Sequence, residues 1–163
     1  MKPIKLSRLI EALESDSTEC VTRVDLQNGC VVSVEDAVFR AVEEGDEEAL
    51  RDPPEWQKPE VEIARALVAD PGKRFVEPPN KFDFHEYRHM ERFIGTVEDP
   101  AAAEQLWEAI KGRGAFRYFK GTANRLGLLQ QWFQYRDDAM KRFVIAWSEA
   151  RNVPYEDDIK NRK

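Results

Sequence analysis

Apolar residues recur every three or four positions through most of residues 83–151 of this chain. That spacing places them on one face of a helix, so the second half is expected to be helical almost throughout. Helices are predicted over four segments: residues 83–97, 101–111, 115–126 and 128–151. A chain that uses so much of its length for helices has room only for a small sheet elsewhere.

Strand-like alternation is found in the first half, where residues 21–34 predict a β-hairpin. A three-residue turn with Gly29 in the left-handed conformation sets Leu26 opposite Cys30. This register makes one face of the hairpin apolar and places Asp25 and Arg23 on the other face, whereas a two-residue turn mixes the faces.

The other elements of the first half are shorter. We expect a third strand over residues 73–77 and helices over residues 4–14, 36–44 and 60–69. The expected fold class is therefore α/β of the α+β type: a small antiparallel sheet with an N-terminal hairpin, packed on a mainly helical C-terminal half. A length of 163 residues fits a single domain, assigned to residues 1–155, and residues 156–163 are expected to form a frayed, charged tail.

The composition excludes several classes of protein. No run of about 18 apolar residues is present, so neither a membrane span nor a membrane partner is expected. The chain shows no signal peptide, and its two cysteines are too few for a disulfide framework, which favours a cytoplasmic protein. No cofactor is expected, and the oligomeric state is left open.

Charge is distributed unevenly along the chain. Residues 35–62 contain eleven acidic and three basic residues, and the net charge of the whole chain is −6. Residues 111–125 are the opposite, because they contain basic residues and no acidic one: Lys111, Arg113, Arg117, Lys120 and Arg125.

The basic segment is the strongest candidate for a binding surface. We predict that Arg113, Arg117 and Lys120, with Tyr118 between them, contact an acidic protein partner or a small anion. RNA or single-stranded DNA binding through the same residues is an alternative, with Tyr118 stacking on a base. A third interpretation is structural: the basic residues only balance the acidic segment, and the segment's phenylalanines, Phe116 and Phe119, belong to the core.

Residues 85–89 match the zinc-hydrolase pattern H-E-x-x-H. On one helix, His85 and His89 would lie one turn apart and share a zinc ion, and Glu86 would act as general base. The opposite interpretation is that both histidines are exposed on the solvated face, with Arg92 beside them, and that Glu86 forms a capping box with Asp83.

Arg136 lies on the apolar stripe of the last helix, one turn after Trp132. A buried guanidinium needs a carboxylate or several carbonyl groups as partners. Arg136 is therefore a candidate for a structural buried charge, with an anion clamp as the functional alternative.

Three pieces of the chain together resemble the bacterial uncharacterised protein family number 158. They are Val24-Asp25-Leu26-Gln27-Asn28-Gly29, the helix Tyr87–Ile94, and Gly112–Lys120 followed by Trp132-Phe133-Gln134-Tyr135-Arg136. The resemblance covers roughly residues 4–152 and implies a small cytoplasmic α/β protein with no assigned activity. It brings no catalytic residue, and the family pattern does not call for His85 or His89.

These observations favour a non-enzymatic interaction or adaptor module over an enzyme, because the chain offers no convincing nucleophile or acid–base pair. The two alternatives are nucleic-acid binding through the basic segment and a zinc-dependent hydrolase at residues 85–89.

Overall fold

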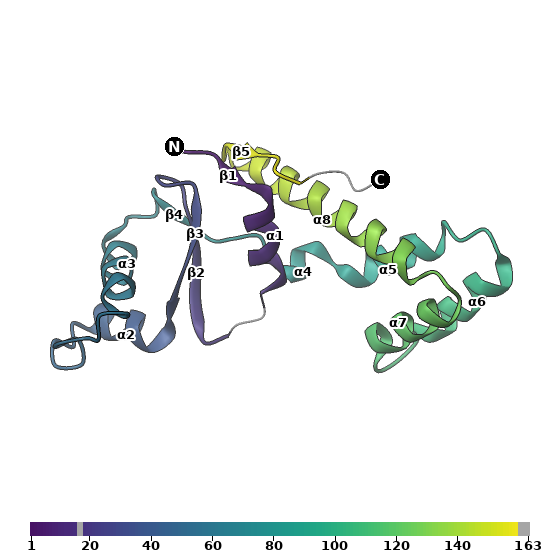
Figure 1. The fold of residues 1–163 in the computed structure, drawn as a ribbon, viewed down its shortest axis with the longest axis horizontal. Helices are drawn as coiled ribbons and strands as arrows, with labels where there is room; N and C mark the ends of the chain where they lie inside the picture. The colour runs from purple at the N-terminus through teal and green to yellow at the C-terminus, as the bar shows by residue number, and fades with distance from the viewer. Residues whose placement is uncertain (16–17, 160–163) are drawn as a thin grey trace. The chain divides into compact units, whose positions relative to one another are not determined.

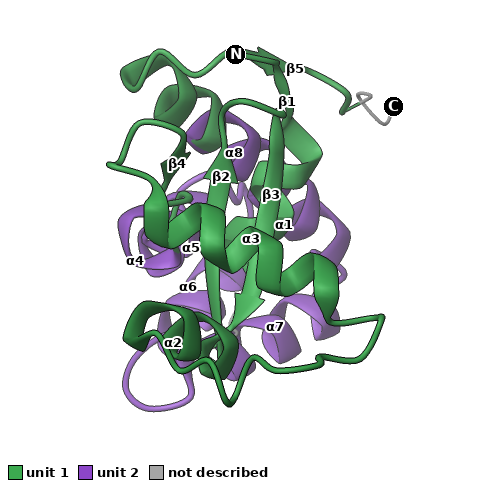
Figure 2. Cartoon of the chain, turned by 90° about the vertical axis from the view of Figure 1, so that its left-hand side faces the viewer, with its two compact units in different colours: residues 1–80, 144–163 green, residues 81–143 purple. Residues whose placement is uncertain are grey.

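The computed structural model describes residues 1–15 and 18–159 and divides the chain into two compact units. Unit 1 joins residues 1–80 to the segment that begins at Val144, and unit 2 contains residues 81–143 (Figure 2). The predicted class, a small antiparallel sheet in the N-terminal half and a mainly helical C-terminal half, is confirmed (Figure 1). That the chain behaves as a single domain stays a prediction, since two compact units can unfold together or separately.

The strands and three of the helices lie in unit 1. Along the chain they are β1 (Ile4–Lys5), α1 (Leu6–Glu14), β2 (Cys20–Asp25), β3 (Cys30–Glu35), α2 (Asp36–Glu44), α3 (Lys58–Ala69), β4 (Phe75–Val76) and β5 (Tyr155–Glu156). The main sheet has the order β3-β2-β4 and is antiparallel. Helices α2 and α3 form a small core with β3, whose buried members are Val34, Val38, Val61 and Ala64.

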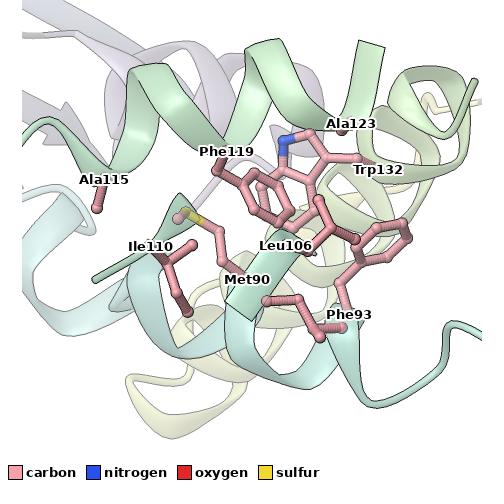
Figure 3. Close-up of a cluster of buried hydrophobic side chains, with 9 residues drawn as sticks. Met90, Phe93, Leu106, Ile110, Ala115, Phe119, Ala123 and Trp132 are labelled. Carbon is pink, nitrogen blue, oxygen red and sulfur yellow. The ribbon is translucent and has the colours of Figure 1, made fainter. Parts of the chain in front are cut away.

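Unit 2 is helical. Its elements are α4 (Lys81–Phe84), α5 (Glu86–Ile94), α6 (Pro100–Ala109), α7 (Ala115–Arg125) and the first part of α8 (Leu129–Ala150), which continues into unit 1. The helices enclose an apolar core built around Met90, Phe93, Leu106, Phe119 and Trp132 (Figure 3). Within the described ranges, no helix combines the length and apolar character needed to cross a membrane.

The predicted hairpin register is wrong by one residue. Cys30 lies opposite Asp25 instead of Leu26, so the turn contains four residues. The cause is the side chain of Asp25, which is buried and accepts hydrogen bonds from the backbone N–H groups of Gln27 (3.0 Å) and Asn28 (3.4 Å). A prediction from apolar alternation places Asp25 on the solvent face, but these bonds and an ion pair with Arg74 hold it inside.

Both ends of unit 1 differ from the sequence prediction. Ile4 does not begin the first helix but pairs with Tyr155 in a parallel two-stranded sheet, β1-β5. The start of the expected frayed tail is held in place, because Asp158 accepts a hydrogen bond from the Ser7 N–H (3.0 Å). Residues 160–163, the remainder of that tail, lie outside the described residues.

Gly29 is required at the end of the hairpin turn. Its φ is +64°, and an added Cβ would lie 2.5 Å from the Pro3 carbonyl oxygen. We expect Gly29→Ala to lower the free energy of unfolding by about 2 kcal/mol, from left-handed strain and displacement of the N-terminal segment. Urea unfolding followed by circular dichroism measures this.

Gly45→Ala is the matched control. Gly45 has a similar φ of +69°, but an added Cβ there meets no described atom within 4 Å. Only the backbone strain of about 1 kcal/mol should then appear. Equal losses of unfolding free energy in the two variants would show that the approach of the N-terminal segment to Gly29 does not contribute to stability.

Candidate functional site

Helix α7 begins directly after Gly114 and buries one stripe of side chains in the core of unit 2. The stripe consists of Ala115, Phe119 and Ala123, spaced by four residues. The Phe119 ring lies edge-on to Trp132 on α8, with 4.9 Å between the ring centroids (Figure 3). This packing determines which residues of the basic segment face outward.

Two of the predicted cations share the outer face of α7. Arg117 and Lys120 are three residues apart, hence neighbours on the helix surface, and both are exposed. Arg113, also exposed, lies in the turn before the helix. The expectation that Phe116 belongs to the core is wrong: its position is rotated by about 100° from that of Ala115, and it is 46% exposed. We call Arg113, Phe116, Arg117 and Lys120 the α7 face.

Tyr118 does not belong to the α7 face. It is exposed, but its position on the helix is rotated by about 160° from that of Lys120. Its ring borders a groove against α6, lined also by Glu108, Lys111 and Arg125. The structure therefore turns Tyr118 away from Lys120, although it stays about 100° from Arg117 on the helix.

The basic residues of this segment differ in whether their side chains have hydrogen-bonding or ion-pair partners. Lys111 forms an ion pair with Glu108 (2.8 Å), which raises the pKa of its ammonium group, and Arg125 donates a hydrogen bond to Gln105 (3.0 Å). Within residues 1–15 and 18–159, no hydrogen bond or ion pair is found for the side chains of Arg113, Arg117 and Lys120. The α7 face thus carries cations without carboxylate partners and an exposed aromatic ring.

The H-E-x-x-H segment does not lie on one helix. His85 has left-handed backbone angles (φ 54°, ψ 66°) and stands between α4 and α5, so the expected single helix over residues 83–97 is interrupted there. The expected solvated position of His89 is also wrong. His89 is half-buried and stacks on Phe84, with 4.4 Å between the rings. Burial lowers the pKa of His89, and the charge of Arg92 lowers it further.

The arrangement around this segment also differs from a metal centre. In the part of the chain that the structure describes, no three His, Cys, Asp or Glu side chains are grouped so that they could hold a metal ion. Glu86 does not form the predicted capping box, because the helix starts at Glu86 itself. Its carboxylate pairs instead with the guanidinium of Arg136, and both side chains are largely buried. Arg136 thus joins α8 to the start of α5.

Sequence reasoning missed a second group of cations in unit 2. Arg88, Arg92 and Arg142 border one groove, together with both histidines. Arg142 is separated from Arg92 by 50 residues in the sequence, and no pattern along the chain links them. Their common location depends on the packing of α5 against α8.

Comparisons with known proteins give one family. A model of an uncharacterised protein family, UPF0158, matches residues 52–160. A UPF0158 protein of Pseudomonas aeruginosa is 29% identical over 65 residues, which cover 39% of this chain and 42% of that relative. The matched segment thus spans less than half the length of the relative. No solved structure matches the chain.

Proposed function

Because the chain belongs to the uncharacterised protein family UPF0158, as its sequence predicted, we propose its function from its own surface: it is a non-enzymatic interaction module whose α7 face binds an acidic segment of a partner protein. The observation that carries this proposal is the group of exposed cations without carboxylate partners beside the exposed ring of Phe116.

The chemistry of the α7 face suits such a partner. Unpaired cations attract acidic segments over a distance and speed the encounter of the two proteins. Arginine and aromatic residues are enriched where partners make close contact, and Phe116 supplies apolar area next to Arg117. An acidic partner would neutralise charges that the described part of the chain leaves unpaired.

The other two interpretations have less support. Base stacking by Tyr118 needs free cations beside its ring, but the two cations that line its groove, Lys111 and Arg125, are bound to Glu108 and Gln105. A zinc hydrolase needs His85 and His89 on one turn of one helix, but the left-handed residue His85 precedes the helix.

Charge reversal on the α7 face tests the proposal. We expect Arg113→Glu/Arg117→Glu to reduce capture of the partner from the native cell by at least about tenfold, since repulsion replaces attraction at two contacts. Quantitative mass spectrometry of the eluates measures the loss. The affinity of the identified partner for the purified wild-type protein is then measured at increasing salt concentration. The affinity should fall as salt screens the charges.

The matched control is Arg51→Glu/Lys73→Glu in unit 1, which changes the net charge equally at two exposed positions. Its capture should equal that of the wild type. A partner retained by the α7 variant would refute the proposal. Nuclease-sensitive nucleic acid lost from that variant's eluate, with no protein lost, would favour the nucleic-acid alternative instead.

A further inference from the structure

A basic groove lies between α4–α5 and α8 within unit 2 and has a volume of about 340 Å³. From α5 it is lined by Arg88 and Arg92, one turn apart, and from α8 by Tyr135 and Arg142. The stacked pair of Phe84 and His89 forms part of its wall. A volume of this order suits a small ligand.

The groove is lined by more positive than negative side chains. Within the described residues, the side chains of Arg88, Arg92 and Arg142 have no hydrogen bond or ion pair. Asp83 supplies the single carboxylate among the described lining residues. The nearby Glu86 is already occupied by Arg136. Three like charges around one hollow repel one another, and a bound anion would remove that repulsion.

His89 shows that the fields of the three arginines converge. Burial is the largest cause that lowers the pKa of His89. The charges of Arg92, Arg142 and Arg88, which lie on two helices, lower it further. A hydrogen bond to the backbone of Phe84 opposes this effect and holds the ring in place. His85 also borders the groove, in a left-handed conformation that is strained for a residue other than glycine.

We propose that this groove binds the phosphate group of a small phosphorylated molecule, with Arg88, Arg92 and Arg142 donating to its oxygens. A guanidinium presents a planar fork of hydrogen-bond donors that matches the oxygens of a phosphate. A phosphate dianion also neutralises more of the positive charge of several arginines than a single carboxylate does. The half-buried His89 ring, held by stacking on the buried Phe84, borders the groove and can contact the rest of the molecule. The proposal is independent of the α7 face, because the two sites share no residue.

The first test uses inorganic phosphate as the probe, at an ionic strength kept constant with chloride. The two histidines of the chain give separate NMR signals, which a His85→Asn variant assigns. Saturable binding should raise the pKa of His89, since a dianion offsets the arginine charges that lower it. No saturable change in the His89 signal would overturn the proposal.

The second test uses variants. Arg92→Gln/Arg142→Gln should weaken phosphate binding by about tenfold or more, because charge-assisted hydrogen bonds are lost. Arg51→Gln/Lys73→Gln removes the same charge at two exposed positions of unit 1 and should leave binding unchanged. Equal weakening in both variants would show a general effect of net charge and would refute the site.

The source of the phosphate group is tested last, with AMP and a single-stranded oligonucleotide as probes. Binding of AMP that competes with inorganic phosphate and is lost in Arg92→Gln/Arg142→Gln supports a small phosphorylated molecule. If only the oligonucleotide binds, and the same variant removes its binding, the ligand is nucleic acid and the proposal is wrong. Loss of phosphate binding with normal partner capture separates this result from that for the α7 face.

Discussion

Phe119→Ala is expected to lower the free energy of unfolding of unit 2 by about 3–5 kcal/mol. The Phe119 side chain is fully buried and packs against two other rings. Its ring centroid is 4.9 Å from that of Trp132 and 6.2 Å from that of Phe93, both in edge-on contacts. Truncation leaves a cavity where α7 meets α8 and removes both aromatic contacts. Urea unfolding followed by tryptophan fluorescence measures the loss.

The same substitution three residues earlier is the control. Phe116 lies on the same helix but is 46% exposed, so Phe116→Ala should cost less than about 1 kcal/mol. It should nevertheless weaken partner capture, since Phe116 belongs to the proposed binding face. If both variants lose the same stability, the assignment of inner and outer faces of α7 is incorrect.

Asp25→Ala is expected to destabilise unit 1 by about 2–4 kcal/mol. The Asp25 carboxylate is 1% exposed and receives two bonds from Arg74, each of 3.0 Å. It also receives the backbone N–H bonds that shape the hairpin turn. Removing it leaves these donors unpaired, although Arg74 is one-third exposed and can regain water, which limits the cost.

The effect of Asp25 should depend on pH. Burial raises the pKa of its carboxyl group, but the hydrogen bonds from Arg74, Asn28 and Gln27 lower it more, so the pKa lies below its usual value. The stabilisation is therefore complete above the unfolded pKa of about 4 and is lost as the pH falls through the lower folded pKa. Unfolding of the wild type and of Asp25→Asn should converge at the acid end.

Asp36→Ala is the control for Asp25→Ala. Asp36 pairs with Arg40 at 3.8 Å, and both side chains are exposed. Surface pairs of this kind contribute less than about 1 kcal/mol. A similar loss for both aspartates would mean that the Asp25–Arg74 pair is not the anchor of the hairpin.

The sequence predicted the main helices well because the apolar stripe that marks each of them also buries it. It predicted the segment of α2 as residues 36–44, which is where α2 lies. The hairpin register failed because alternation treats every carboxylate as a surface group. Asp25 is internal, and its partner Arg74 is 49 residues away along the chain.

The break at His85 could not be read from periodicity. The apolar spacing continues across the junction of α4 and α5, while the backbone of a single residue takes the left-handed conformation. The stacking of His89 on Phe84 accompanies this break. Non-glycine residues take that conformation only when their surroundings stabilise it, and those surroundings are tertiary.

The candidate sites also show that sequence patterns find only residues that lie close together along the chain. Arg113, Arg117 and Lys120 were found because they are close in sequence, but the rotation of α7 turns Tyr118 away from Lys120 and toward the groove against α6. The groove of Arg88, Arg92 and Arg142 left no local signal, since it joins residues of two helices. Composition finds sites within one segment, whereas sites formed by two segments appear only after packing.

The pairing of β1 with β5 has a consequence for synthesis on the ribosome. β1 pairs with β5, and the adjoining residues Ser7 and Asp158, which share a hydrogen bond, are 151 positions apart. The strand β1 therefore leaves the ribosome long before the strand with which it pairs. Residues 81–143 emerge as one continuous stretch, and every residue assigned to unit 2 is then present. A nascent chain that stops before residue 144 therefore has all of unit 2 but only the first part of unit 1. In such a chain β1 is present without β5, the strand with which it pairs.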